Sequence, residues 1–468
     1  MVANFSSGSR IWSRETFGSC QLGNTLRTER LVDYASRQAA RPHVSTNAAC
    51  GGSSAAAEGA YRFLENDSVS PMAIAEGAFE STARRHKGSR KNLILMDMTG
   101  QTFTHSSVSD ELVGYNKDDD LGRGWKVHSS LVVDVESKNK IRVLGLIDQV
   151  WWQRDPKGPG KAMRKQRPYE EKESFKWQAA SERIGKRLGD MSNTVTVCDR
   201  EADIFEFLRY KRRAGEGFLV RANHNRKVES DEGFLWETLK KQTKAFEMKI
   251  KIPQRGATGK KGARKERTAV GSVRFGEIVI SHSKYESIVV NAVWVIEEDP
   301  PQGIEPIEWM LLTSEAVNTQ EDAERIIQWY RLRWMIEDFH RTWKSICTAS
   351  KRRMQYADNL QRLLIILGFI AVRLLQLRSL ADADPGASCM TILSQTEWEC
   401  LYRTQHESNK IPKTPLTVNW ALEAIAKLGG WRDTKGTGRK GIESLARGFT
   451  AFLDIVRGYE LALRSAKT

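Results

Sequence analysis

Two aspartates stand where buried strands are expected to end. Asp97 follows the apolar run LILM, and Asp199 follows VTVC. A carboxylate at the end of a buried strand lies where α/β sheets usually place their functional sites. Aspartate is also a common turn former and helix cap, and the segment DREAD, which begins at Asp199, could simply start a helix. Both aspartates are therefore candidates for chemistry, with a capping role as the alternative.

The segment that follows residue 330 predicts a helix with polar side chains gathered on one side. Tyr330, Arg333, Glu337 and Lys344 follow the pattern Y-x2-R-x3-E-x6-K. At about 100° per residue they fall within a stripe roughly 60° wide, and Arg341 lies beside it. One interpretation is an exposed ladder of ion pairs, each contributing only about a few tenths of a kcal/mol. The other is a metal-binding carboxylate flanked by cations that bind phosphate.

Three carboxylates from two strand ends and one helix can bind two Mg²⁺ ions: Asp97, Asp199 and Glu337. Such a pair of ions stabilises both the attacking and the leaving oxygen of a phosphoryl transfer. Magnesium prefers oxygen ligands. The six cysteines lie far apart and show no CxxC or CxxxH spacing, so neither a zinc site nor a disulfide framework is predicted. The basic stripe would hold a DNA backbone beside the metals.

The elements that position these residues are expected to be helices around a strand-rich middle. Residues 1 to about 75 are predicted to be helical, with an amphipathic helix over Leu22–Ala40. From about residue 90, three strands, a helix over Glu170–Leu188, a strand before Asp199 and another helix predict an α/β domain with a mixed sheet. Long helices are expected from Gln320 to Cys347 and from Asn359 to about Leu380, and the remainder is mostly helical.

Residues 217–315 predict antiparallel β structure without helices between the strands. Within this segment, Lys249–Arg267 carries eight basic residues against one acidic residue. A second basic loop, rich in proline and glycine, runs from Arg154 to Arg167. Solvated loops are the ordinary interpretation of both segments, but two such loops in a basic chain favour contacts with backbone phosphates.

Composition narrows the class of partner. The 468 residues include 73 Lys and Arg against 58 Asp and Glu, which gives a net charge of +15. This length predicts two to four domains, and the charge indicates a polyanionic partner, either nucleic acid or a membrane surface. The N-terminus shows no apolar signal segment, and the longest apolar run, LLIILGFIAV, is about half a membrane span and is followed by Arg373. A buried helix, a cytoplasmic protein and a nucleic-acid partner are expected.

The sequence resembles the bacterial cut-and-paste DDE transposases, the insertion-sequence group with the Y-R-E-K signature. The resemblance covers nearly the whole chain, and its most specific element is WYRLRWMIEDFHRTWK. The other matching segments are LGNTLRTERLV, AAEGAYRFLEN, LMDMTGQTFTH, GRGWKVHSSLV, VCDREADI, EWMLLTSE, RRMQYADNLQRL, AVRLLQLR and NWALEAIAKLGGWRDTKGTG.

The resemblance implies an α/β fold, a ribonuclease-H-like catalytic core with an antiparallel β insertion, flanked by N-terminal and C-terminal helical domains. Residues 1–75 would form the end-recognition DNA-binding domain. Residues 76–380 would form the catalytic domain, with the insertion at about 215–318. Residues 381–468 would form a helical dimerisation domain.

The resemblance also assigns roles to individual residues. Asp97, Asp199 and Glu337 would be the catalytic, metal-binding triad, and Trp309 would stack on a flipped base. The remaining residues expected to contact DNA are Arg27, Arg30, Arg62, Arg221, Tyr330, Arg333, Arg341, Lys344, Arg353 and Asn359. Met98 departs from the family pattern, because relatives often carry threonine after the first aspartate.

The implied activity is that of a transposase. A homodimer would bind two transposon ends on double-stranded DNA, cut them by Mg²⁺-dependent hydrolysis and hairpin formation, and join the 3′-OH ends to target DNA. Two Mg²⁺ ions are implied, and Mn²⁺ would substitute for them. The protein would be cytoplasmic and associated with the bacterial nucleoid, with no membrane partner. The alternatives are a catalytically inactive end-binding inhibitor or domesticated relative, and a ribonuclease-H-like nuclease without strand transfer.

Overall fold

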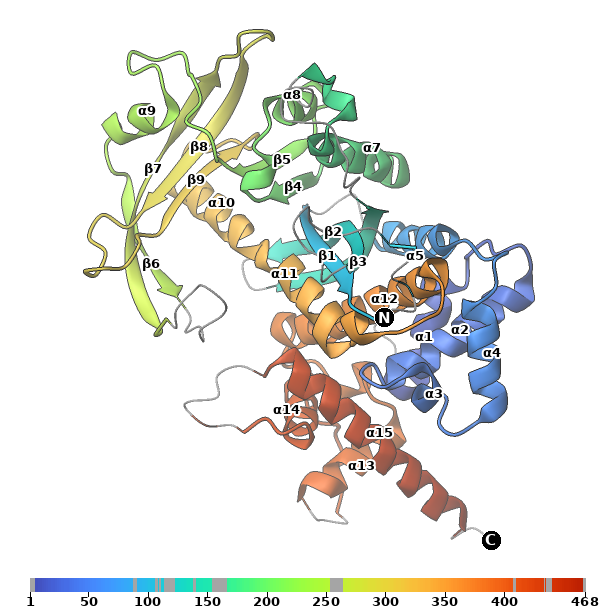
Figure 1. The fold of residues 1–468 in the computed structure, drawn as a ribbon. Coiled ribbons are helices and arrows are strands. Elements are labelled where there is room, and N and C mark those ends of the chain that lie inside the picture. The colour runs from blue at the N-terminus through green and yellow to red at the C-terminus, as the bar shows by residue number, and fades with distance from the viewer. Residues whose placement is uncertain are drawn as a thin grey trace. The chain divides into compact units, whose positions relative to one another are not determined.

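The computed structural model describes residues 5–86, 91–105, 108, 111–112, 123–137, 140–153, 166–252, 264–406, 410–432, 434 and 440–465. The chain forms two compact units. Unit 1 contains residues 1–90, 98–160 and 335–468, and unit 2 contains residues 91–97 and 161–334. The positions of the units relative to each other are not determined (Figure 1). This division cuts across the predicted domains 1–75, 76–380 and 381–468, whose bounds remain predictions.

Helices fill the N-terminal part of unit 1, as predicted: α1 (Phe5–Phe17), α2 (Thr25–Ala40), α3 (Thr46–Ala49), α4 (Ser54–Leu64) and α5 (Pro71–Arg85). The side chains of Asn24, Ser45 and Ser53 cap α2, α3 and α4, each by accepting a hydrogen bond from a backbone N–H in the first turn. The cap at Asn24 explains why the helix predicted over Leu22–Ala40 begins at Thr25.

The apolar run LLIILGFIAV lies in α12 (Ala357–Ala383), a helix predicted over 359–380. This helix is long and apolar enough to cross a membrane, but 83% of its most apolar window is buried inside the structure. It packs against α5 and β3 (Lys140–Trp152) in unit 1. The Trp343 indole N–H donates to the Leu364 carbonyl at 2.9 Å. The prediction of a buried helix is confirmed.

Three further helices lie in the C-terminal part of unit 1: α13 (Gln395–His406), α14 (Val418–Leu428) and α15 (Ile442–Ser465). They share an apolar core with the end of α12, and this core includes Trp398, Phe449 and Phe452. Glycines allow α14 and α15 to approach closely. A Cβ atom on Gly448 would lie 1.8 Å from the Ile425 carbonyl oxygen.

The strands of unit 1 are β3, β2 (Arg123–Ser137) and the second part of β1 (Asn92–Phe103), in that order. The strands of unit 2 are the first part of β1, β4 (Thr194–Cys198), β5 (Gly217–Arg221), β9 (Glu308–Thr313), β8 (Ile288–Ile296), β7 (Arg267–Ile280) and β6 (Phe246–Ile252). Because β1 is common to both, these nine strands form one mixed sheet. The β1–β4 and β4–β5 pairs are parallel, and the pairs from β5 to β6 are antiparallel.

The helices of unit 2 are α7 (Lys176–Leu188), α8 (Phe205–Arg213), α9 (Leu235–Lys241) and α10 (Gln320–Leu332). Two short 3₁₀ turns precede α7 over residues 169–175, so this helix begins later than the predicted Glu170. Helix α9 contradicts the prediction that residues 217–315 lack helices. It forms because Leu235 and Leu239, one turn apart, are both buried, and because Asn225 accepts a hydrogen bond from the Trp236 backbone N–H. The basic loops predicted within 154–167 and 249–267 lie largely outside the described residues.

The single helix predicted from Gln320 to Cys347 is also wrong. Helix α10 ends at Leu332, α11 spans Trp334–Arg341, and a π-helical turn follows over Thr342–Ile346. The Arg333 N–H bonds to the Tyr330 carbonyl, which tightens the turn between the helices, and the Cys347 N–H bonds to the Thr342 carbonyl across the wider π turn. The stripe calculated for a uniform helix therefore does not continue through Lys344.

Arg362 on α12 holds the end of the N-terminal helical segment in unit 1. Its guanidinium is 1% exposed and donates to the Val69 carbonyl at 2.6 Å, the Leu64 carbonyl at 2.8 Å and the Asn359 side-chain oxygen at 2.7 Å. A buried guanidinium with three acceptors replaces the water that these carbonyl groups would otherwise bind. Asn359 thus serves in the structure to orient Arg362.

Replacing Arg362 with alanine should lower the free energy of unfolding by about 3 kcal/mol, because two buried carbonyl groups lose their donor. Urea unfolding followed by circular dichroism measures the change. The control, Arg331→Ala, removes an exposed arginine from α10 and should change stability by less than about 0.5 kcal/mol. An Arg362→Ala variant as stable as the control would contradict this role.

Candidate active site and nucleic-acid interface

Asp97 and Asp199 stand at the same level on neighbouring strands of unit 2. The parallel pairing of β1 with β4 ends with Leu95 opposite Val197, and each aspartate lies two residues further along its strand direction. Asp97 does not end its strand as predicted, because β1 continues to Phe103 beside β2. Asp199 keeps an extended backbone, with φ −84° and ψ −166°, so the register continues to it. Since paired strands lie about 4.8 Å apart, the two side chains emerge side by side.

Several charged groups act on the Cys198 thiol, which is buried at the end of β4. Burial raises the pKa of the Cys198 thiol, and the negative charges of Asp199 and Asp97 act in the same direction. The positive charges of Lys211 and Arg333 oppose them. All these charges are therefore within electrostatic reach of one buried thiol at the end of β4.

Asp199 also has the capping role that the sequence left open. Its side-chain oxygen accepts a hydrogen bond from the Glu201 backbone N–H at 2.9 Å and starts a 3₁₀ turn over Arg200–Ala202. One carboxylate has several lone pairs, so this bond leaves acceptor capacity for a further ligand. The capping and functional interpretations of Asp199 are compatible.

Four residues expected to contact DNA surround the Asp97 side of this edge within unit 2. An Arg333 guanidinium nitrogen lies 3.9 Å from an Asp97 carboxylate oxygen, and its guanidinium carbon lies 5.9 Å from the centre of the Tyr330 ring. The Trp309 ring lies 5.9 Å from the same Tyr330 ring at a tilt of 59°. We call these residues, together with Arg221, the aromatic–arginine cluster.

Arg221 completes the cluster from the end of β5. It donates to the Glu308 backbone carbonyl at 2.7 Å, which ties it to the strand that carries Trp309. Burial lowers the pKa of Arg221, while the hydrogen bond to Tyr330 acts in the opposite direction. The cluster thus places two guanidinium groups and two aromatic rings beside Asp97. Guanidinium groups can bind phosphates, and aromatic rings can stack on bases.

The sequence analysis missed a pair that fixes the segment after Asp199. Asp203, the second aspartate of DREAD, is 2% exposed. It accepts hydrogen bonds from the backbone N–H groups of Asn223 and His224 and from two guanidinium nitrogens of Arg226, at 2.6–2.9 Å. These bonds join the turn that follows Asp199 to the chain beyond β5. The available signal was a second aspartate in a short acidic motif.

The remaining predicted residues of the catalytic part belong to unit 1. Glu337 lies half-buried on α11, and Lys344 lies half-buried on the π turn. Arg341 is exposed and pairs with Asp338 at 2.8 Å, whereas Arg353 is exposed after the following turn. Since the two units are not placed relative to each other, the structure brings Asp97 and Asp199 together but does not relate Glu337 to them.

Three predicted DNA-binding arginines share one hollow in unit 1. Arg27, Arg30 and Arg62 line a cavity of about 420 Å³ between α2 and α4. Arg30 crosses α4 at Gly59, where an added Cβ would lie 2.1 Å from a guanidinium nitrogen. Arg62 and Arg30 are exposed, and Arg62 pairs with Glu58. A concave basic surface between two helices suits a DNA backbone.

The Asp97–Asp199 edge fits a hard divalent cation by its chemistry. Both groups offer carboxylate oxygens, the ligands that Mg²⁺ prefers, from a rigid pair of strands. Among the described residues, no three side chains of His, Cys, Asp or Glu gather as a metal site. Asp97 and Asp199 are two of the three predicted ligands, and the third, Glu337, lies on unit 1.

Two family models match this chain. Residues 9–69 match the transposase DNA-binding model, and residues 172–374 match the transposase DDE domain. Together they cover more than half of the 468 residues. The chain therefore carries a transposase DNA-binding domain and a transposase DDE domain. The DNA-binding match of the transposase includes Arg27, Arg30 and Arg62, and the DDE match includes Asp199 and Glu337 but begins after Asp97.

The two family matches add information about the partner, the fold and the use of metals. A DNA-binding domain makes DNA a partner of the transposase. A DDE domain implies a ribonuclease-H-like fold, consistent with the mixed α/β structure, and DDE transposases generally use divalent metals. In unit 2, the neighbouring carboxylates of Asp97 and Asp199 are suited to binding a divalent metal.

Replacing Arg30 with alanine should weaken binding of a DNA duplex and reduce its salt dependence. If Arg30 neutralises one phosphate, the slope of log K against log salt should fall by about 0.9. Fluorescence anisotropy across a salt series gives the slope. The control, Arg213→Ala, removes an arginine that is 59% exposed and lies on unit 2. An Arg30→Ala slope equal to the wild-type slope would contradict phosphate contact.

Proposed function

We propose that the transposase binds the two ends of a mobile DNA element, cuts the DNA there and joins the freed 3′-OH ends to target DNA. The observation that carries this proposal is the placement of Asp97 and Asp199 at one level on paired parallel strands, with Arg333 beside Asp97. The chain combines this edge with a transposase DNA-binding domain and a DDE domain, so both recognition and phosphoryl transfer have a place in it.

Asp97, Asp199 and Glu337 would hold two Mg²⁺ ions, for which Mn²⁺ would substitute. The ions would supply charge stabilisation to the attacking and leaving oxygens when bound. Asp97 and Asp199 are suited to this because β1 and β4 fix their spacing, and because the Asp203–Arg226 pair holds the turn after Asp199. Met98 has no hydroxyl group, so it cannot support the first carboxylate by an O–H hydrogen bond.

The aromatic–arginine cluster would hold the DNA strand beside the carboxylates. Arg333 and Arg221 would bind backbone phosphates, and Tyr330 supports both through its ring and its hydroxyl group. The Trp309 ring would receive a flipped base, which suits the strained hairpin route of strand cleavage. Lys344, Arg341 and Arg353 of unit 1 would extend the phosphate contacts. Asn359 could join them only by giving up its bond to Arg362.

End recognition would fall to the hollow that contains Arg27, Arg30 and Arg62. Residues 1–75 would form the recognition domain and 76–380 the catalytic domain, in which the antiparallel strands within about 215–318 are the proposed β insertion. Residues 381–468 would mediate a homodimer that pairs two ends. A nucleoid-associated, cytoplasmic location follows from a DNA substrate.

Changing either aspartate to asparagine should abolish cleavage and leave binding in place. Asp97→Asn and Asp199→Asn should each slow cleavage of a fragment with cognate ends by about 10³-fold or more in Mg²⁺, because the cation loses a charged ligand. Gel assays of cleavage, and of binding in EDTA, separate the two properties. Asp231→Asn, at an exposed position of unit 2, is the matched control.

The products decide between the proposal and its alternatives. Ends released by the wild type and joined to a plasmid support transposition. Binding without any cleavage in Mg²⁺ or Mn²⁺ would indicate an inactive end-binding protein, and cleavage without joining would indicate a nuclease. Cleavage that persists in Asp199→Asn would remove that residue from the site.

Removal of the Trp309 ring should affect one stage of the reaction. Trp309→Ala should leave the first nick intact and slow the later release of ends by about 5- to 150-fold, the range expected for one lost stacking contact. Trp309→Phe keeps a ring and should recover most of the rate. Denaturing gels resolve nicked and released strands. Equal slowing of the nick and the release would contradict a base-stacking role.

A further inference from the structure

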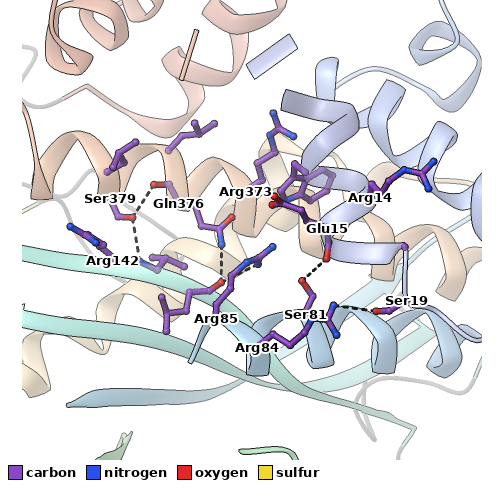
Figure 2. A pocket seen from close by; sticks show the side chains of 16 residues that line it. Arg14, Glu15, Ser19, Ser81, Arg84, Arg85, Arg142, Arg373, Gln376 and Ser379 are labelled. Atoms are coloured by element: carbon purple, nitrogen blue, oxygen red, sulfur yellow. Dashed lines mark hydrogen bonds between the residues drawn. The ribbon is translucent and has the colours of Figure 1, made fainter. Parts of the chain in front are cut away.

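A second basic cavity lies in unit 1, and it shares no lining residue with the hollow that contains Arg27, Arg30 and Arg62. It has a volume of about 740 Å³ and lies among α1, α5, β3 and α12 (Figure 2). This volume is within the range of sites for small organic ligands, about 300–1,000 Å³. Five arginines and one carboxylate, Glu15, contribute to its walls. The arginines are Arg14, Arg84, Arg85, Arg142 and Arg373.

Two of these arginines already have carboxylate partners outside the cavity. Arg14 donates to Glu29 at 2.7 Å, and Arg142 lies 3.7 Å from Glu136. In Figure 2, Arg14 and Arg142 lie at opposite ends of the group of side chains. Arg84, Arg85 and Arg373 lie between them in the same view.

Arg84 and Arg85 are held by neutral acceptors. Arg84 donates to the Ser19 hydroxyl at 3.2 Å, and Arg85 donates to the Leu144 backbone carbonyl at 3.4 Å. Neither forms an ion pair with a carboxylate among the described residues. Burial lowers the pKa of Arg85, Glu15 acts in the opposite direction, and the neighbouring Arg84 lowers it further. Arg85 thus has one opposing charge, Glu15, and one neighbouring like charge, Arg84.

Arg373 brings a third positive charge to the cavity from α12. It is 4% exposed, donates to the Gly8 carbonyl at 3.1 Å and lies 5.0 Å from the centre of the Trp12 ring. Burial lowers the pKa of Arg373 to about 9, against the opposing effect of Glu397 and Glu15. An anion in the cavity would offset the cost of burying this charge.

The rest of the cavity wall is apolar. Trp12, Val143, Leu144, Leu377 and Leu380 line it beside the arginines. A bare phosphate would leave this surface unused, whereas a ligand with an anionic end and a flat apolar body would contact both kinds of wall. Nucleotides have this chemistry, because arginine binds their phosphates in a planar fork and apolar side chains contact the base.

We propose that this cavity binds a nucleotide unit, with its phosphate at Arg84, Arg85 and Arg373 and its base against the apolar wall. The same chemistry could be presented by a free mononucleotide or by a nucleotide of a DNA strand. Because α1 and α5 meet β3 and α12 at this cavity, a bound nucleotide would join the N-terminal helices to the core of unit 1.

The test measures binding to the full-length protein in EDTA, so that it is independent of catalysis. ADP, adenosine and inorganic phosphate are titrated separately by calorimetry, and each is added in thermal-unfolding experiments. Oligo-dT and a blunt duplex form the DNA arm of the test. Arg84→Gln, which changes an exposed side chain, and the double variant Arg84→Gln/Arg85→Gln probe the cavity. Arg213→Gln is the control in unit 2.

If free nucleotides fill the cavity, ADP should bind at millimolar concentrations or below and raise the unfolding temperature, while adenosine and phosphate bind more weakly. The double variant should bind ADP about tenfold or more weakly than the wild type does. If the nucleotide belongs to DNA, ADP has no effect and the double variant weakens oligo-dT or duplex binding by a similar factor. The proposal is overturned if no probe binds, or if the double variant and Arg213→Gln behave alike toward every probe.

Discussion

The parallel pairing of β1 with β4 is the constraint on which the account of the site depends. Two strands far apart in the sequence meet in one register, and that register sets Asp97 beside Asp199 just where the pairing ends. The paired residues are buried on both faces, so a shift by one residue would exchange the side chains that pack against each face. The spacing of the two carboxylates is therefore fixed by the hydrophobic core. A polar pair on a rigid support of this kind can hold a cation without reorganising.

Positive charge is arranged around this edge within unit 2. Arg333 lies beside Asp97, and Tyr330 links it to Arg221 and Trp309, so the groups that suit a phosphate and a base occur together. Asp203 has a structural role instead. Its carboxylate accepts several hydrogen bonds from the protein and stabilises the turn after Asp199. Three aspartates in one small region thus divide into two that remain accessible and one that is structural.

Much of this could be predicted from the sequence, because the signals are local. The apolar run before Asp199 predicted the end of β4, and the burial of α12 followed from the length of its apolar run and from Arg373. The strand end predicted at Asp97 was wrong, because β1 continues to Phe103. The uniform helix through Lys344 was wrong, because the tightened turn at Arg333 and the π turn depend on packing rather than on periodicity. Helix α9 was missed because only two apolar positions signal it, and the roles of Asp203 and Arg362 depend on partners distant in the sequence. The placement of Glu337 beside the two aspartates stays a prediction.

The most direct test of the account asks whether Asp97 and Asp199 hold one cation together. Electron paramagnetic resonance counts Mn²⁺ bound to the full-length wild type, to each single Asp→Asn variant and to the double variant, without DNA. The account predicts that either substitution weakens the same site, and that the double variant loses little more than each single variant does. Losses that add fully, or Mn²⁺ binding unchanged in both single variants, would contradict a shared site where the pairing of β1 with β4 ends.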